Sequence, residues 1–300
     1  MDTLVSTKPL GLGGHPAAST PVARNGAYSL LLSVGAELYK LRKRPATWLL
    51  AGLFALVIVV FNDVASSIAL QTVSATDPDR AGFRDLTLFE NLSTSALSVV
   101  AMLGGPIVLI LGALISGSEY GWTTFKTILT QGPSRLTIFG SKVVSLAVLV
   151  AGFVILGWMA SAAGSLVVSV FESTPVAMPS LGSLVGGLGA GWFVAMVWGT
   201  VGLALGLIFR TTTVPIGLGL IWGLAVESII AGLAGSVSIF ATIQDYLIGP
   251  NASALAVAVG VTALGGDSTI STTHALLVLT GYVVVLVGIA ASLFRTRDLT

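Results

Sequence analysis

The 300-residue chain is 54% hydrophobic and only 9% charged, and its mean hydropathy is +0.97. A soluble domain of this size needs far more charge to cover its surface, so the composition is that of an integral membrane protein. A net charge of +1, the absence of cysteine and the presence of only two histidines argue against a nucleic-acid partner and a zinc site and exclude disulfide and thiolate chemistry.

The first 24 residues hold prolines, glycines and small polar residues, with no apolar stretch that would form a core. Such a segment does not bury enough apolar surface to fold by itself. We therefore divide the chain into a flexible tail, residues 1–24, and a transmembrane domain, residues 25–300.

From Tyr28 onward, apolar residues recur at helical spacing, while Glu37 and Lys40 lie off the apolar face. The segment ends in a basic run that closes with Arg44, directly before Pro45. An amphipathic helix with a basic end beside a span lies in the membrane interface, with its cations on the lipid headgroups. The same cations are also compatible with a plain topology signal. We favour the interfacial helix, marked by Glu37, Lys40 and Arg44.

Six apolar runs are long enough to cross a hydrocarbon layer of roughly 30 Å. We expect the spans at about residues 46–68, 94–115, 143–170, 184–209, 214–234 and 275–294. Pro106 predicts a kink in the second span, because proline removes a helical hydrogen bond. The small-xxx-small spacing of Gly202 and Gly206 predicts close helix packing in the fourth. Asp63 lies near the far end of the first span, where we expect its carboxylate to reach water.

The longest connection joins the fifth and sixth spans. Its apolar part, residues 252–264, is too short to cross the membrane comfortably. We interpret it as a re-entrant or interface-lying helix, with Asp245, Pro250 and Asn251 at a break before it.

A polar-to-amphipathic segment, Glu119 to Lys142, separates the second and third apolar runs. Its bulky apolar residues recur at helical spacing, and Glu119 is expected in the first turn of the helix, where the macrodipole favours an anion. Pro133 ends this helix, and Ser134 is placed to cap the next one. The pattern predicts a short helix lying across one membrane face.

Counting cations orients the spans. If both termini lie in the cytoplasm, every lysine and arginine except Arg80 and Arg84 falls on the cytoplasmic side. The positive-inside rule supports this orientation. A seventh span at 252–264 would place Arg295 and Arg297 outside, so we reject it.

Glu227 lies about two-thirds of the way across the fifth span. An ionised carboxylate near the bilayer centre costs roughly 2.5 to 3.5 kcal/mol on insertion scales, so it needs a partner or a wet cavity. Two interpretations stay open. Glu227 is either a proton or substrate-cation site, or the acceptor of a structural hydrogen bond from a neighbouring helix.

Three elements, in order, resemble the permease subunits of ABC transporters of the type-2 exporter (ABC-2) family. The segment Glu37 to Lys40, followed by Arg42, Lys43, Arg44 and Trp48, resembles that family's entry helix. The segment Glu119 to Thr124, followed by Leu129, Pro133, Arg135 and Lys142, resembles its first cytoplasmic loop. The fifth-to-sixth connection resembles its re-entrant outer segment. The resemblance covers about residues 28–297.

The resemblance implies that the first cytoplasmic loop is a coupling helix that docks into a separate ATPase subunit. It also implies pairing with a second copy or with a homologous permease. Carried over to this chain, the residues at or beside the ATPase contact are Glu119, Gly121, Thr123, Arg135 and Lys142. The chain has no Gly-x-x-x-x-Gly-Lys-Ser/Thr run. We therefore expect ATP to be bound and hydrolysed by the partner, and no catalytic, cofactor or metal residue here.

These observations predict an all-α, six-span membrane protein with an N-terminal interfacial helix, a coupling helix and a re-entrant outer helix. We expect it in a bacterial plasma membrane, with both termini cytoplasmic and with lipids but not nucleic acid as partners. Its predicted function is the translocation pathway of an ATP-driven exporter. The alternative is an ion- or proton-coupled secondary transporter that uses Glu227. The apolar span faces do not indicate a substrate.

Overall fold

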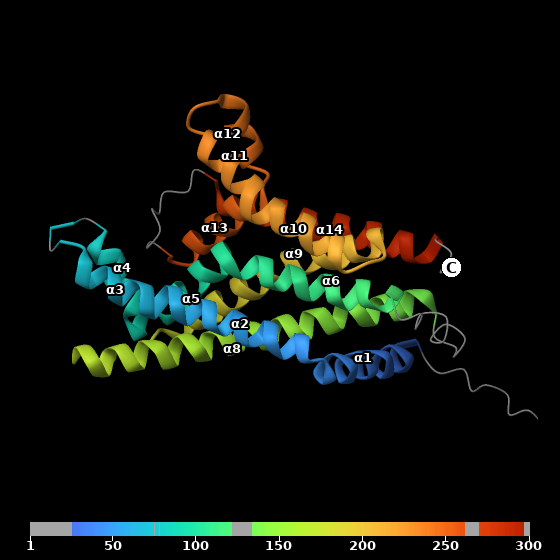
Figure 1. Ribbon diagram of the computed structural model, residues 1–300, viewed down its shortest axis with the longest axis horizontal. Coiled ribbons are helices and arrows are strands. Elements are labelled where there is room, and N and C mark those ends of the chain that lie inside the picture. Colours follow the sequence, from blue (N-terminus) through green and yellow to red (C-terminus); the bar gives the residue numbers. More distant parts are fainter. Residues whose placement is uncertain (1–25, 75, 78, 122–133, 262–269, 297–300) are drawn as a thin grey trace, which may run out of the picture.

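The computed structural model describes residues 26–74, 76–77, 79–121, 134–261 and 270–296, and Figure 1 shows their arrangement. Within these ranges all regular secondary structure is helical. Six helical stretches are long and apolar enough to cross a membrane, which confirms the predicted number of spans. They are Pro45–Thr72, Phe89–Ser118, Arg135–Glu172, Leu181–Phe209, Thr213–Leu233 and Thr272–Thr296.

Several spans are built from more than one helical element. The first comprises α2 (Pro45–Val59), η1 (Val60–Val64) and α3 (Ala65–Thr72). The second comprises η2 (Phe89–Asn91), α5 (Leu92–Val99), η3 (Val100–Gly104) and α6 (Gly105–Gly121). The third and fourth are α8 (Arg135–Glu172) and α9 (Leu181–Phe209). The fifth comprises α10 (Thr213–Leu220), η4 (Ile221–Val226) and α11 (Glu227–Leu233), and the sixth is α14 (Thr272–Thr296).

The remaining elements are short or lie beside the spans. They are α1 (Gly26–Lys43), α4 (Arg80–Thr87), α12 (Ser238–Gln244) and α13 (Ile248–Ala258). In Figure 1, α1 lies at the end of the bundle that also carries the C-terminal end of α14, which we call the α1 end. At the opposite end, α3 and α4 extend from the bundle, while α11 and α12 project sideways from it, nearer the middle of its long axis.

The centre of the bundle is the crossing of α6 and α9. A Cβ atom added to Gly112 would meet the backbone oxygen of Gly199, and one added to Gly202 would meet that of Leu109. The two backbones therefore touch, as small residues allow in membrane helices. The close packing predicted for the glycine-rich fourth span is confirmed at this crossing. In an 18-residue apolar stretch of the second and of the fourth span, 78% and 67% of residues are buried, against 11% in the fifth and sixth.

Near Pro106, where the sequence predicts a kink, the helix has a widened turn. The π-helical element η3, Val100–Gly104, ends two residues before the proline. Proline has no amide to donate to the carbonyl one turn back, so the helix rearranges in the turn before it. Two further π-helical turns, η1 and η4, interrupt the first and fifth spans. No proline lies within either turn, and hydropathy does not reveal them.

The short apolar helix between the fifth and sixth spans begins earlier than predicted. The expectation was residues 252–264, with Pro250 and Asn251 at a break before it. Instead, α13 runs Ile248–Ala258 and includes both residues in its first turn. Proline fits there because first-turn amides have no helical partner. The Asn251 side-chain amide donates to the backbone oxygens of Asp245 and Leu247, at 2.8 and 2.7 Å, and so holds the preceding turn.

Candidate functional site

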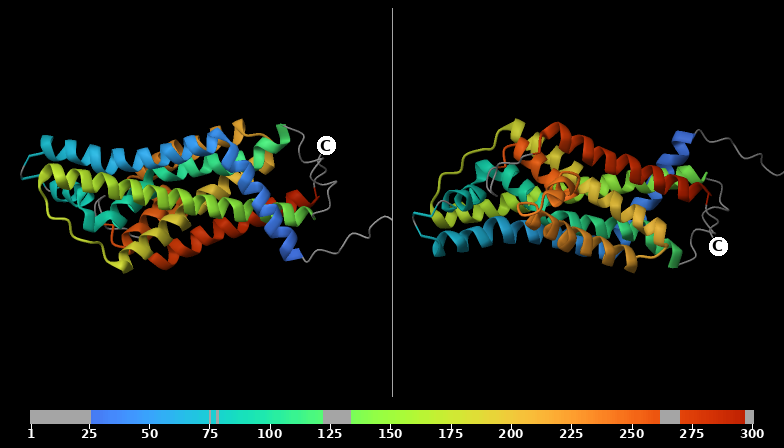
Figure 2. Two further views of the ribbon diagram at one scale, coloured as in Figure 1. Left: turned by 90° about the horizontal axis from the view of Figure 1, so that it is seen from below. Right: turned by 90° about the horizontal axis from the view of Figure 1, so that it is seen from above.

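The first candidate site lies at the α1 end, where α1 crosses α8 obliquely (Figure 2). Val34, Glu37 and Leu41 form the face of α1 that is buried in the bundle. The predicted apolar face, which includes Leu31 and Tyr39, is instead exposed, at 70% and 65%. The helix therefore directs its acidic residue inward and its large apolar side chains outward. This arrangement suits a helix that rests on a bundle and faces lipid, as we expect of an interfacial helix.

Glu37 forms two ion pairs. Its Oε1 accepts from Lys142 Nζ on α8 at 2.9 Å, and its Oε2 lies 2.6 Å from Lys40 Nζ one turn along α1. The side chain of Lys142 is completely buried, and it also donates to the backbone oxygen of Ile115 at 3.4 Å. Burial raises the pKa of the Glu37 carboxyl. The charges of Lys142 and Lys40 and the hydrogen bonds they donate outweigh this effect and hold the pKa below its ordinary value.

Arg44 links the same region to α6. Its guanidinium donates to the Ser118 hydroxyl at 2.7 Å and to the backbone oxygen of Leu114 at 3.4 Å. Arg44 is the N-cap residue between α1 and α2, with Pro45 at the first helical position. Because this backbone junction is fixed by the proline, the arginine stays directed at the end of α6.

Together, these contacts connect α1 and the α1–α2 junction to α6 and α8, the two helices that flank residues 122–133 in the sequence. Arg44 binds Ser118, close to the end of α6, and Glu37 binds Lys142, in the second turn of α8. The sequence assigned Glu37, Lys40 and Arg44 to an interfacial helix and Lys142 to a coupling loop. The structure places all four at one end of the bundle.

The remaining predicted coupling residues have different positions. Glu119 was expected in the first turn of a helix, but it lies near the C-terminal end of α6, which runs to Gly121. That expectation was wrong because the second span continues further than its apolar run. Thr123 lies outside the described residues. Arg135 begins α8, whose N-cap is Ser134 as predicted, and its guanidinium donates to the Arg295 backbone oxygen at 3.4 Å.

Lys142, which the resemblance placed at or beside the ATPase contact, does not lie on the surface of the bundle. With its side chain completely buried, it contacts Glu37 and Ile115 rather than the outside of the bundle. An assignment to the ATPase contact therefore describes it less well than a role in holding α1 against α8. Its distance in sequence from Glu37, 105 residues, is why the pairing was not visible beforehand.

Glu227 lies at the other end of the molecule and is buried, with 4% of its surface exposed. Its carboxylate accepts from the backbone amides of Ile248 at 3.3 Å and Gly249 at 2.7 Å, and from the Trp222 indole at 3.1 Å. The amides belong to the first turn of α13, so Glu227 caps that helix from the fifth span. Of the two interpretations left open, this geometry favours the structural hydrogen bond.

Asp63, whose carboxylate we expected to reach water, is instead buried in η1 together with Asn62, at 3% and 0% exposure. Asn62 donates to the Ser161 hydroxyl at 3.4 Å, and Asp63 accepts from that of Ser165 at 3.2 Å. Ser161, Ser165 and Ser169 recur every four residues and form one buried face of α8. This spacing is the sequence signal that could have indicated a polar partner for Asn62 and Asp63. In the described part of the chain no cluster of acidic or histidine side chains is suited to a metal ion.

Six apolar spans around a tight helix crossing, with ion pairs at one end and a capped short helix away from them, define a multi-pass helical membrane protein. The chain matches the family model described as "ABC-2 family transporter protein" over residues 33–226, from α1 to the end of η4, and it belongs to that family. No curated protein matched the sequence. Family membership makes the chain a permease of an ABC transporter, a system whose other component is an ATPase.

Proposed function

We propose that the chain is the permease subunit of an ATP-driven exporter. In this proposal it provides the translocation pathway and is moved by a separate ATPase that binds the connection between α6 and α8. The observation that supports this most strongly is the bonding of α1 and its junction to both sides of that connection. Arg44 contacts Ser118 on α6 and Glu37 contacts Lys142 on α8. A force applied to the connection would therefore act on three helices together.

The same contacts offer a route to the centre of the bundle. Ser118 lies on α6, six residues from Gly112, where α6 and α9 touch through their backbones. Packed helices shift as rigid elements rather than deform continuously. A displacement of α6 at Ser118 would thus reach the α6–α9 crossing, where a pathway would have to open.

The distribution of cations supports a cytoplasmic location for the α1 end. The described cations at that end are Lys40, Arg42, Lys43, Arg44, Arg135, Lys142, Arg210 and Arg295. The opposite end carries Arg80 and Arg84, in α4. We infer that both termini lie in the cytoplasm, where the ATPase and its ATP are available, and that α1 rests on the lipid headgroups. Export as the direction, and a bacterial plasma membrane as the location, follow the family resemblance.

The exposed spans support a second permease, either another copy or a homologous chain. Only 11% of the residues in the apolar stretches of the fifth and sixth spans are buried, far fewer than in the second and fourth spans at the centre of the bundle. Lipid would cover part of this surface, and a partner permease would cover the rest. In the same arrangement α13 would be a re-entrant helix on the outer side, held to the fifth span by Glu227.

The rival function, a secondary transporter driven by protons at Glu227, has less support. The Glu227 carboxylate accepts three hydrogen bonds that α13 and Trp222 provide. These donors occupy the carboxylate in holding the first turn of a neighbouring helix, which is a structural task. Family membership also favours an ATPase as the source of energy.

Co-purification with a candidate ABC ATPase from the same genome tests the proposal. We expect wild-type permease to retain the ATPase and a variant with both Glu119→Ala and Arg135→Ala to lose most of it. The control changes Arg84 and Asp85 to alanine together, because both side chains are exposed at the opposite end. Undiminished retention by the Glu119 and Arg135 variant would remove the docking claim.

A further inference from the structure

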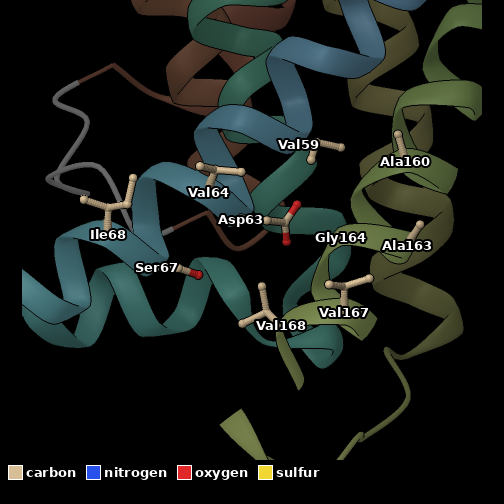
Figure 3. A pocket seen from close by; sticks show the side chains of 10 residues that line it. All are labelled: Val59, Asp63, Val64, Ser67, Ile68, Ala160, Ala163, Gly164, Val167 and Val168. Carbon is tan, nitrogen blue, oxygen red and sulfur yellow. The ribbon is translucent and has the colours of Figure 1, made fainter. Parts of the chain in front are cut away.

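A groove with a volume of about 660 Å³ lies between the first span and α8, on the half of the bundle remote from α1 (Figure 3). Its lining is apolar except for Asp63 and Ser67. Val64, Ile68 and Val167 form its rim and are 47%, 57% and 54% exposed, so the groove opens outward from the bundle. In a membrane this opening faces lipid, and the volume lies in the range of sites that hold drug-sized molecules.

The groove contains a carboxylate oxygen for which the described residues supply no hydrogen-bond donor. Asp63 points from η1 toward α8 at Gly164 (Figure 3), and its Oδ1 accepts from Ser165. Its Oδ2 is buried and has no hydrogen-bond partner among the described residues. A Cβ atom on residue 164 would collide with Oδ2, so glycine is required for the carboxylate to lie there.

Ser67 adds a second polar atom to the same groove. It lies one turn beyond Asp63, in α3, and its hydroxyl oxygen is buried without a hydrogen-bond partner in the described chain. Buried polar atoms are normally paired, and an unpaired one inside a membrane span calls for an explanation. Two such atoms bordering one apolar groove point to a ligand that brings its own hydrogen-bond donors.

We propose that this groove binds an amphipathic cation, with its ammonium group on Asp63 Oδ2 and Ser67 Oγ and its hydrocarbon along the lining valines Val59, Val64, Val167 and Val168. The groove lining contains no lysine or arginine that would neutralise the carboxylate. A carboxylate in apolar surroundings attracts a cation and repels an anion, and a neutral lipid would leave it without a counterion. The site is distinct from the α1 end and does not depend on the proposed function.

Photolabelling of the full-length chain in dodecyl maltoside micelles tests the proposal. The probe is a dodecylamine with a diazirine in the middle of its chain, and the comparison is the matching dodecanol. We expect the amine to label peptides containing Val64 to Ile68 and Val167 to Val168 at concentrations about tenfold below the alcohol, as an added charged hydrogen bond allows. Labelling by amine and alcohol at equal concentrations would overturn the proposal, because it would identify an apolar crevice alone.

Three variants separate the carboxylate from the groove. Asp63→Asn keeps the shape and is expected to abolish the preference for the amine. Asp85→Asn makes the same change on an exposed residue at the same end and is expected to preserve it. Val167→Trp fills the groove from an exposed position and is expected to lower labelling by both probes, even if Asp63→Asn does not fold. An unchanged preference in folded Asp63→Asn, or unchanged labelling in Val167→Trp, would contradict the site.

Discussion

Glu37 and Lys142 form a buried ion pair, 2.9 Å between Oε1 and Nζ, that joins α1 to α8 across 105 residues of sequence. Lys142 is completely buried, whereas Glu37 has a second partner in Lys40. The pair is therefore asymmetric. Loss of the Glu37 carboxylate removes an anionic partner from a completely buried ammonium, while loss of Lys142 leaves the carboxylate paired with Lys40.

Replacing either partner tests this asymmetry. We expect Glu37→Gln to lower the free energy of unfolding by about 3 to 5 kcal/mol, the usual cost of removing one member of a buried ion pair. Lys142→Met should cost less, because Lys40 still neutralises Glu37. Thermal unfolding of the purified variants in detergent measures both. Equal losses, or a smaller loss for Glu37→Gln, would contradict the asymmetry.

The same pair predicts a dependence on pH. The pKa of Glu37 lies below its ordinary value of 4.5 in the folded chain. Its contribution to stability is therefore complete above that ordinary value and is lost as the pH falls through the lower folded pKa. We expect the difference in Tm between wild type and Glu37→Gln to be constant from pH 7 to about pH 5 and to shrink in more acidic buffer. A difference that grows on acidification would have the wrong sign.

The cap on α13 gives a third prediction. Glu227→Ala removes the acceptor for two first-turn amides of that helix and should destabilise it by about 1 to 3 kcal/mol. Hydrogen exchange at the amides of Ile248 and Gly249 is the direct measurement, and both should exchange faster. Trp222→Phe removes only one donor to the same carboxylate, so it should leave these amides nearly as protected. Unchanged protection in Glu227→Ala would show that the cap does not hold the helix.

The crossing of α6 and α9 gives a fourth prediction. Gly202→Ala would place a Cβ atom against the backbone oxygen of Leu109. Because a backbone atom does not yield as a side chain does, we expect a loss of about 1 to 3 kcal/mol or more. Gly152→Ala in α8 is the control, since nothing lies within 4 Å of its added Cβ. It should be neutral or raise stability by up to about 1 kcal/mol. Equal Tm values for the two variants would argue against backbone contact at the crossing.

Periodicity and hydropathy were sufficient for the six spans and for the glycine-mediated packing, because both depend on local composition. The pairing of Glu37 with Lys142 was out of reach, because it joins residues on helices whose relative position only the fold defines. Asp63 shows a second limit. The π-helical turn η1 rotates it toward α8, where Gly164 and Ser165 receive it. Hydropathy alone placed it near water, and only the serines of α8 hinted at a polar neighbour.

The predicted boundaries differed most where spans continue into connections. α6 runs on to Gly121, so Glu119 belongs to the end of a span rather than the start of a separate helix. Likewise α13 begins at Ile248 because its first-turn amides are satisfied by Glu227, a residue of another span. In both cases the apolar run was a poor guide, because helices end where backbone hydrogen bonding ends, not where hydrophobicity does.

The proposed coupling is tested most directly by cross-linking, because the chain contains no cysteine. A single cysteine replacing Thr123, in the connection after α6, would be compared with one replacing Ser74, an exposed residue at the opposite end. Both permeases would be reconstituted with the ABC ATPase that co-purifies with wild type and treated with a short bifunctional thiol–amine reagent. We predict a permease–ATPase product from the cysteine at residue 123 and none from residue 74. A product from residue 74 alone, or from neither position when the complex is intact, would contradict the account.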